Sequence, residues 1–398
     1  MYEYENFNYN PRKMAEIQNK VTSDNHRINN VWDITFDPTI DIDDFNGISV
    51  YDINEIAKKH KQFQCYIIDL SYVDSNENEQ TLDNVKKKSE RIYIKDIQFN
   101  TCDFIGSNNG KKITFRNCTF EKSYFGYSTL TDVNFENCTF NSSSFALTKF
   151  IRCRFDHNCN FNLISISGGK TVFTESVISA DKFINSIFQY ATKDYCLNNP
   201  SKNIDAEKSM MFTSMVKLSR NILESVSQNG DDAYYYNAAK QVHKLKIKER
   251  HYKKIWDIKK DKPTNWVEWI LTKCRCFLIY FAMPIESFIL NALGFLNGWG
   301  ASISRCALFG TSLLTLFSII YFFSGMEPSQ PHEGFLPHII KSIIQSFDIT
   351  FLAGYTKYVS AKDDYATQLV CLLNMLLGLT WYAISIPTVI NKISINRI

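Results

Sequence analysis

The chain has 398 residues, of which 45% are hydrophobic and 14% aromatic, so it can form two or three folded domains and is not expected to be disordered. Its 44 Lys and Arg residues against 41 Asp and Glu give a net charge of +3, too near neutral to indicate nucleic acid or an acidic substrate as a partner. Eleven cysteines are spread along this length, and we expect all of them to be reduced.

No motif of catalysis or cofactor binding stands out. The seven histidines lack the spacing of metal ligands, and no glycine-rich loop suited to phosphate is present. We therefore expect no enzyme activity, no cofactor and no metal. Residues 1–94 are rich in Asn, Asp and Lys with short apolar runs, and we expect them to form an N-terminal cap for the segment that follows.

A five-residue period covers residues 95–190. A Phe or Leu recurs at every fifth position, and the residue two positions before it is mostly small. Neither a helix nor a strand has a period of five. The central series comprises Phe115, Phe120, Phe125, Leu130, Phe135, Phe140, Phe145, Phe150 and Phe155, and the small residues include Cys118, Cys138 and Cys153.

This pattern resembles the pentapeptide-repeat family. The resemblance implies a right-handed quadrilateral β-solenoid with four repeats per coil, in which the Phe or Leu and the small residues form interior ladders. Cys118 and Cys138 are twenty residues apart and should therefore stack in successive coils. The slightly basic array disfavours DNA mimicry; its surface either senses a cytosolic ligand or protein regulator, or serves as a passive scaffold.

Residues 201–262 are predicted to form a helical hairpin broken near residues 228–232, with an Asp N-cap on the second helix. The second helix is strongly basic and comes just before the apolar segments. By the positive-inside rule, this places the N-terminal domain in the cytoplasm. The basic face either contacts anionic lipid or is simply solvated.

Residues 264–303 are apolar and aromatic but are interrupted by Lys273, Arg275, Pro284, Glu286 and Asn291. We expect amphipathic helices that lie at the membrane interface with tryptophans at head-group depth. The alternative is a third span, which would reverse the topology.

Residues 304–398 are predicted to form a two-span module. Residues 305–323 and 366–391 are long and apolar enough to cross a bilayer. The stretch between them is too short for a domain. Within it, residues 335–358 are predicted to form a short pore helix and, from just before Gly354, a filter segment. Irregular backbone survives at membrane depth only where protein encloses a watery path, so this order predicts a re-entrant pore loop.

The module resembles two-span potassium-type channels. Aligned on Gly354 and Tyr355, the filter motif Thr-Val-Gly-Tyr-Gly-Asp matches at two of six positions. The element Asn297-Gly298-Trp299-Gly300 is similar to a Gly-Tyr-Gly element in bacterial channels that carry pentapeptide repeats. The resemblance implies a homotetramer, with a selectivity filter of Leu352, Ala353, Gly354, Tyr355 and Thr356.

Departures from that motif bear on selectivity. Thr356 replaces a glycine that needs positive φ, and Leu352 replaces the threonine that completes the innermost ion site, so we expect monovalent cations to permeate with poor selectivity. Lys357 replaces an aspartate at the outer mouth. Either Asp348 and Lys357 form a salt bridge that supports the filter, or they are an unrelated pair.

Two residues of the second span attract attention. Gly378 is expected to be either a gating hinge or a site of close helix packing. Asn374 is expected either to line a cavity or to form a polar contact between helices.

These features together predict a mixed fold: a β-solenoid, a helical linker and an α-helical pore module. We expect a multi-pass protein of the cell (inner) membrane, a homotetrameric ion channel in contact with the lipid bilayer and regulated by its cytoplasmic solenoid. The alternatives are a membrane-anchored scaffold that does not conduct, and a membrane-depolarising effector in bacterial defence.

Overall fold

In a computed structural model, the protein forms two compact units, Met1–Ser287 and Phe288–Ile398. The residues that it describes are 50–57, 62–64, 67–70, 91–100, 102–108, 111–126, 128–145, 147–166, 171–190, 204–229, 231–260, 263, 265–324, 335–351, 358 and 365–395.

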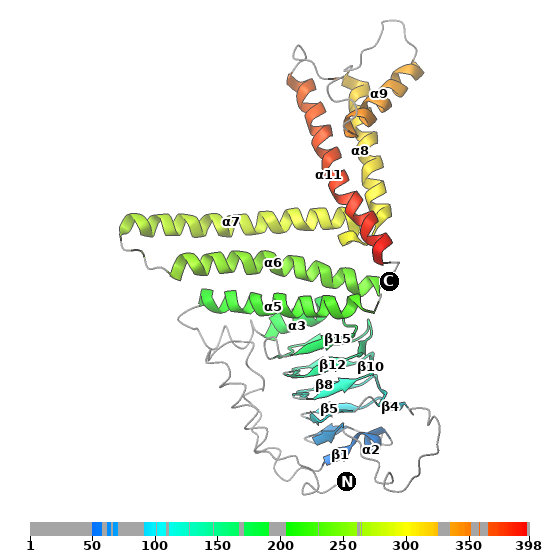
Figure 1. The fold of residues 1–398 in the computed structure, drawn as a ribbon, viewed down its shortest axis with the longest axis vertical. Helices are drawn as coiled ribbons and strands as arrows, with labels where there is room; N and C mark the ends of the chain where they lie inside the picture. The colour runs from blue at the N-terminus through cyan, green and yellow to red at the C-terminus, as the bar shows by residue number, and fades with distance from the viewer. Residues whose placement is uncertain are drawn as a thin grey trace. The chain divides into compact units, whose positions relative to one another are not determined.

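The first unit contains a solenoid of short parallel strands (Figure 1). The strands and the one short helix among them are β1 (Val50–Asp52), α2 (Ile53–Ala57), β2 (Phe63–Gln64), β3 (Ile67–Asp69), β4 (Ile92–Lys95), β5 (Gln98–Asn100), β6 (Asp103–Ile105), β7 (Ile113–Arg116), β8 (Thr119–Glu121), β9 (Thr129–Thr131), β10 (Val133–Glu136), β11 (Thr139–Asn141), β12 (Lys149–Ile151), β13 (Arg154–Phe155), β14 (Asn160–Asn162) and β15 (Val172–Thr174).

The strand pairing explains the five-residue period. Each central coil contributes one strand or bridge to each of four parallel sheets, in the orders β1-β3-β6, β13-β10-β7-β4, β14-β11-β8-β5-β2 and β15-β12-β9. Phe115 pairs with Phe135, and Phe120 with Phe140, so four repeats of five residues make one coil. The prediction of a β-solenoid is thereby confirmed.

The sheets extend beyond the expected boundary at residue 95. β2 pairs with β5, and β3 pairs with β6, so residues 50–70 add strands to two of the four sheets. The five-residue period is absent here, because a strand can join a sheet through its backbone without a regular side-chain repeat. The remaining residues of the expected 1–94 region lie largely outside the described part.

Aromatic rings fill the interior of the solenoid. The Phe and Leu side chains of the period are fully buried or nearly so, from Phe115 through Phe155. Rings one coil apart stack in parallel: the centroids of Phe120 and Phe140 are 4.7 Å apart, and those of Phe135 and Phe155 are 4.6 Å apart. Offset stacking adds to the stabilisation from apolar burial alone.

The small residues form a second interior ladder by hydrogen bonding to the preceding coil. The thiol of Cys138 donates to Phe115 O at 3.4 Å, and that of Cys153 donates to Leu130 O at 3.2 Å. The hydroxyl of Ser143 donates to Phe120 O at 3.1 Å in the same way. Burial raises the pKa of Cys153 to about 12, so this thiol stays protonated and unreactive. The nine cysteines that the structure describes are all free.

Left-handed residues turn the corners of each coil. Asn117 and Asn137 have φ values of 53° and 51°, and each directly precedes a buried cysteine. Their side chains form a ladder, since Asn137 Nδ2 donates to Asn117 Oδ1 at 2.9 Å and Asn117 Nδ2 donates to Asp96 Oδ1 at 2.9 Å. Asn and Asp tolerate this backbone conformation better than most residues, because their short polar side chains bond locally.

Three helices close the C-terminal end of the solenoid: α3 (Ala180–Tyr190), α5 (Ile204–Ser227) and α6 (Asp232–Lys260). Asn221 of α5 acts as a strand substitute for β15, accepting from Phe173 N at 2.8 Å and donating to Phe173 O at 3.0 Å. Ser225 bonds in the same two-way fashion with the backbone of Ser176. The hairpin of α5 and α6 is thus more than a linker, because it satisfies the open edge of the last coil.

The apolar helices are α7 (Trp266–Asn297), α8 (Ile303–Ser324), α9 (Phe335–Thr350) and α11 (Tyr365–Ile395), with a 3-10 turn η4 (Gly298–Gly300) between α7 and α8. Among the residues that the structure describes, three segments are long and apolar enough to cross a membrane: Trp266–Gly300, Ile303–Ser324 and Tyr365–Ile393. Where the sequence suggested several interfacial helices, α7 is a single helix that contains Pro284.

We expect Phe140→Ala to lower the stability of the solenoid by about 3–5 kcal/mol, because the cavity removes contacts with the coils on both sides. Thermal and urea unfolding of the purified chain, followed by circular dichroism, measures this loss. Tyr93→Ala removes an exposed ring from the same solenoid and serves as the control. Equal effects of the two substitutions would contradict a core built on the Phe ladder.

We expect Asn221→Ala to cost about 1–3 kcal/mol, because the N–H and C=O of Phe173 lose their partners at the last coil. Hydrogen exchange at the amide of Phe173 should become faster, while exchange in the central coils changes little. Arg220→Ala, an exposed neighbour on the same helix, should leave this amide protected. Unchanged exchange in Asn221→Ala would show that α5 does not cap the edge.

Candidate functional site: the three-helix membrane module

The second unit centres on a short helix packed against two long ones. α9 has sixteen residues and is about 24 Å long, less than the roughly 30 Å of a bilayer core. It contacts both α8 and α11, and those two helices also contact each other. Ser346 Oγ of α9 donates to Leu314 O of α8 at 3.0 Å. The C-terminal end of α9 is therefore held deep in the module.

A buried polar cluster joins the three helices at that depth. Asn374 of α11 is fully buried, and its Oδ1 accepts from Thr350 Oγ1 at 2.8 Å. Its Nδ2 donates to Tyr321 OH of α8 at 3.1 Å and lies 3.4 Å from Ser346 O. One amide thus bonds with both other helices. Of the two roles weighed for Asn374 from sequence, the geometry within one chain is that of an interhelical contact.

Two glycines allow close packing along the same helices. A Cβ atom on Gly378 would lie 2.4 Å from Thr350 O, and one on Gly310 would lie 2.5 Å from the ring of Trp381. Trp381 Nε1 in turn donates to Cys306 O at 2.8 Å. α11 is an unbroken helix through Gly378, whose lack of a side chain lets α9 end directly against α11.

The expected filter, Leu352, Ala353, Gly354, Tyr355 and Thr356, lies outside the described residues, and so does Lys357. The suggested pair of Asp348 and Lys357 is therefore not described either. Asp348 Oδ2 accepts from Tyr358 OH at 3.0 Å. This bond ties the last turns of α9 to the chain immediately after the filter segment.

The turn before α8 is built from left-handed residues. Gly298, Trp299 and Gly300 have φ values of 59°, 62° and 91°. The ring of Trp299 packs on Gly294, where a Cβ would lie 2.5 Å from it. Asn297 Nδ2 lies 3.4 Å from Thr388 Oγ1 of α11, so this turn joins the start of α8 to the last turns of α11.

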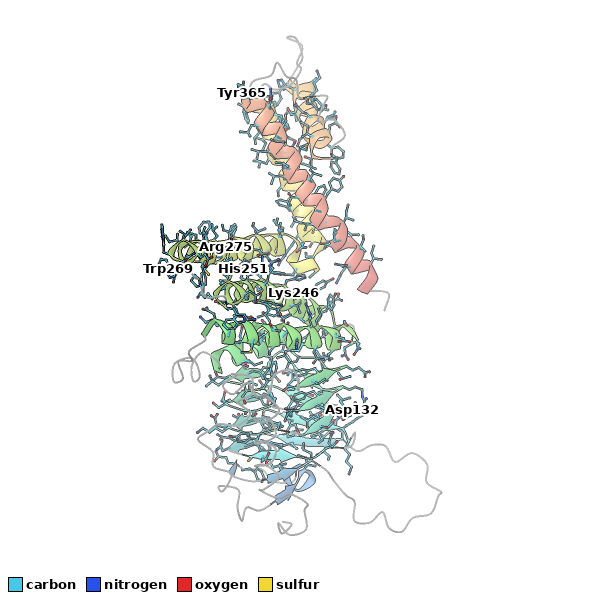
Figure 2. The ribbon with its side chains drawn as sticks, turned by 60° about the vertical axis from the view of Figure 1, so that its left-hand side comes forward. Asp132, Lys246, His251, Trp269, Arg275 and Tyr365 are labelled. Atoms are coloured by element: carbon cyan, nitrogen blue, oxygen red, sulfur yellow. The ribbon has the colours of Figure 1, made fainter. Side chains whose placement is uncertain are left out.

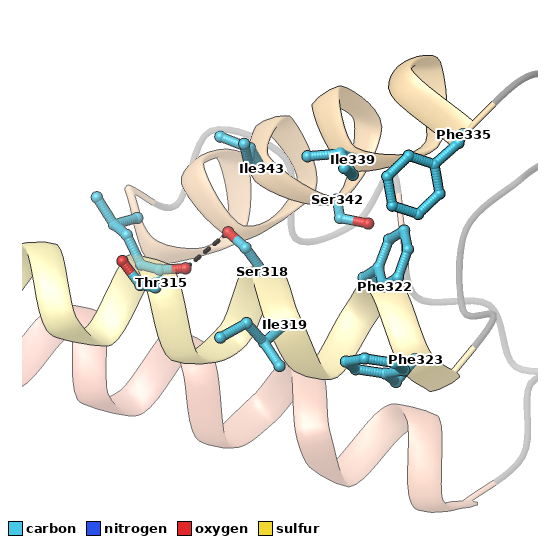
Figure 3. Close-up of a pocket in the computed structure, with 10 residues that line it drawn as sticks. Thr315, Ser318, Ile319, Phe322, Phe323, Phe335, Ile339, Ser342 and Ile343 are labelled. Atoms are coloured by element: carbon cyan, nitrogen blue, oxygen red, sulfur yellow. Dashed lines mark hydrogen bonds between the residues drawn. The ribbon is translucent and has the colours of Figure 1, made fainter.

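A cavity of about 440 Å³ lies between α8 and α9 (Figure 3). Its lining is mostly apolar, with Phe322, Phe323 and Phe335 at one end. The hydroxyls of Thr315, Ser318 and Ser342 all donate to backbone carbonyls of their own helices. The cavity therefore presents an apolar wall and offers little for recognition of a charged ligand.

Tyr321, Ser346, Thr350 and Trp381 are contact residues that the sequence reasoning did not single out. A signal for them exists in retrospect, because polar side chains within apolar helices of a membrane protein face protein rather than lipid. The signal does not pair them, since the partners are separated by as many as 75 residues. Among the residues that the structure describes, no group of three His, Cys, Asp or Glu side chains is placed to hold a metal ion.

Comparison with known proteins adds nothing to this description: no protein-family model, no curated protein and no solved structure matches the chain.

We expect Gly378→Ala to destabilise the module by about 1–3 kcal/mol. The new Cβ would lie 2.4 Å from the backbone oxygen of Thr350, which cannot move aside as the end of a flexible side chain could. The detergent-solubilised chain should lose its helical packing at a lower temperature. Leu379→Ala, which shortens an exposed side chain on the next residue, is the control. A Gly378→Ala chain as stable as the parent would argue against close packing and favour a hinge.

Proposed function

We propose that this chain is one subunit of a tetrameric ion channel with a weakly selective cation pore, located in the cell membrane and regulated by its solenoid. The observation that carries the proposal is the depth at which α9 ends. Thr350 bonds with Asn374 and packs on Gly378, which are nine and thirteen residues after the start of α11. At 1.5 Å per residue, these positions are about 14 and 20 Å along that helix.

That depth is near the middle of a bilayer core if α11 crosses it. Between the end of α9 and the start of α11 lies the segment for which the sequence predicts a re-entrant loop. Backbone that is not helical is stable at such depth only where protein encloses a watery path. This requirement supports a conducting pathway beside the end of α9. The C-terminal end of a helix also carries partial negative charge, which favours cations there.

A single chain supplies only one such segment, so a closed pathway needs several copies around an axis. Four copies follow from the resemblance to two-span potassium-type channels. Many large side chains of α8, α9 and α11 are exposed in the single chain, among them Leu308, Leu316, Phe347 and Leu373. Neighbouring subunits and lipid together would cover them.

The filter residues support weak selectivity rather than a preference for potassium. Leu352 offers no hydroxyl to an ion, and Thr356 occupies a position that favours glycine. The basic character of α6, which precedes the membrane-length segments in the chain, supports a cytoplasmic solenoid by the positive-inside rule. In the cytoplasm, the solenoid would bind a soluble ligand or a regulatory protein.

Currents from the purified full chain in planar bilayers, under opposed potassium and sodium gradients, test this function. We expect single-channel currents whose reversal potential lies near zero. Gly354→Asp should abolish them by placing a carboxylate where the backbone must approach the ion. Thr356→Gly, the matched variant, should still conduct and should shift reversal toward the potassium potential.

Size-exclusion chromatography with light scattering establishes the assembly of each variant before recording. Tetramers that remain silent with cell extract added, for the parent and for Thr356→Gly alike, would contradict conduction. The chain would then be a membrane-anchored scaffold. Currents that persist in Gly354→Asp would place the pore elsewhere.

A further inference from the structure

Helix α7 has a glutamate at the centre of its apolar part. After Lys273 and Arg275, the helix continues from residue 276 to residue 297 with Glu286 as its only charged side chain. By length and composition, α7 is able to cross a membrane. A crossing of this apolar part would place Glu286 near the middle of the bilayer, where a carboxylate needs a partner.

The partners of Glu286 are on α6. Arg250 Nη2 forms an ion pair with Glu286 Oε1, and His251 Nε2 lies 2.7 Å from Glu286 Oε2. The side chain of Arg250 is 51% exposed and that of Glu286 is 39% exposed. The ion pair is therefore half-exposed, as is typical of an ion pair in contact with water rather than with hydrocarbon.

α6 itself is unsuited to hydrocarbon. Exposed lysines lie within a turn of Arg250 on both sides, namely Lys246, Lys248, Lys253 and Lys254. If α7 crossed the bilayer with this ion pair intact, these charges would enter the apolar core together. Each charged side chain there is costly.

The two faces of α7 are different. The less exposed side chains recur at helical spacing, at Thr272, Cys276, Ile279, Met283 and Glu286, and this stripe includes the residue that contacts α6. Three aromatic rings lie on another face and are open, with exposed fractions of 68% for Phe277, 61% for Phe281 and 72% for Phe288. Two faces with such different surroundings are typical of a helix at an interface.

Side chains suited to contact lipid head groups lie near the N-terminal end of the same helix. Trp269, labelled in Figure 2, is 54% exposed. Lys273 Nζ lies 5.6 Å from the centroid of the Trp269 ring. Arg275 is also exposed. Lysine, arginine and tryptophan side chains near an apolar face reach the level of the lipid phosphates.

We propose that α7 lies flat in the surface of the bilayer, with Phe277, Phe281 and Phe288 among the acyl chains and Glu286 tethered to Arg250 and His251 of α6. The occupant of the open apolar face is the lipid bilayer. α8 and α11 are then the two spans. The inference rests on the membrane location in the proposed function, but it does not require the pore to conduct.

Spin labels attached at Phe277→Cys, Phe281→Cys and Phe288→Cys test the orientation in the full chain, reconstituted in phosphatidylcholine and phosphatidylglycerol vesicles. Cys65, Cys196 and Cys274 are replaced by serine first, since the other eight cysteines are buried. The relative accessibility of each label to oxygen and to a nickel chelate gives its depth. A flat helix places all three labels at one shallow depth. A crossing helix separates the first from the last by about 16 Å, and that result would overturn the proposal.

Glu286→Leu tests the tether in the same labelled chains. Without the carboxylate, the apolar part of α7 is uninterrupted and should tilt into the bilayer, so the depths of the three labels should diverge. Glu268→Leu removes the same charge from the first turn of α7 and should leave the depths equal. Equal depths in Glu286→Leu would show that this residue does not hold the helix at the surface. Because depth is measured without current, a silent pore and a misplaced α7 give distinguishable results.

Discussion

Polar groups removed from water must find partners inside the protein, and this constraint organises both units of the chain. In the solenoid, most of the small interior residues bond to a carbonyl of the preceding coil, as Cys138 does to Phe115. In the membrane module, a single amide, that of Asn374, bonds with Thr350 and Tyr321 and so fixes where the short helix α9 ends. The depth of that end carries the functional proposal.

The same constraint explains why a repeat domain and a membrane module can be joined through helices. A stack of parallel coils has an open edge, and Asn221 and Ser225 of α5 satisfy it. α6 packs on α5, and a salt bridge joins the two helices: Lys259 Nζ of α6 lies 2.6 Å from Asp205 Oδ2 of α5. α6 then provides Arg250 and His251 as partners for Glu286 of α7. Each helix thus meets an unsatisfied group of its neighbour.

Some features escaped prediction for identifiable reasons. The coil corners include Lys122 and Arg152, which adopt positive φ although neither residue type favours it, because the turns of a closed coil impose the conformation. Strands β1 to β3 lack the five-residue period and became visible only through their pairing. Pro284 and Glu286 suggested breaks in α7, yet the helix continues, since one charge and one proline are compatible with it when neighbours compensate.

The amino-acid order was sufficient for the coil, the ring-filled interior and the existence of membrane-length helices, because each follows from a short-range period or an unbroken apolar run. Which groups meet was decided by folding. Tyr321, Thr350 and Asn374 are distant in the chain and carry no mark that pairs them, and Glu286 gives no sign of Arg250. Contacts of this kind depend on how whole helices pack, and packing is a property of surfaces that exist only once the chain has folded.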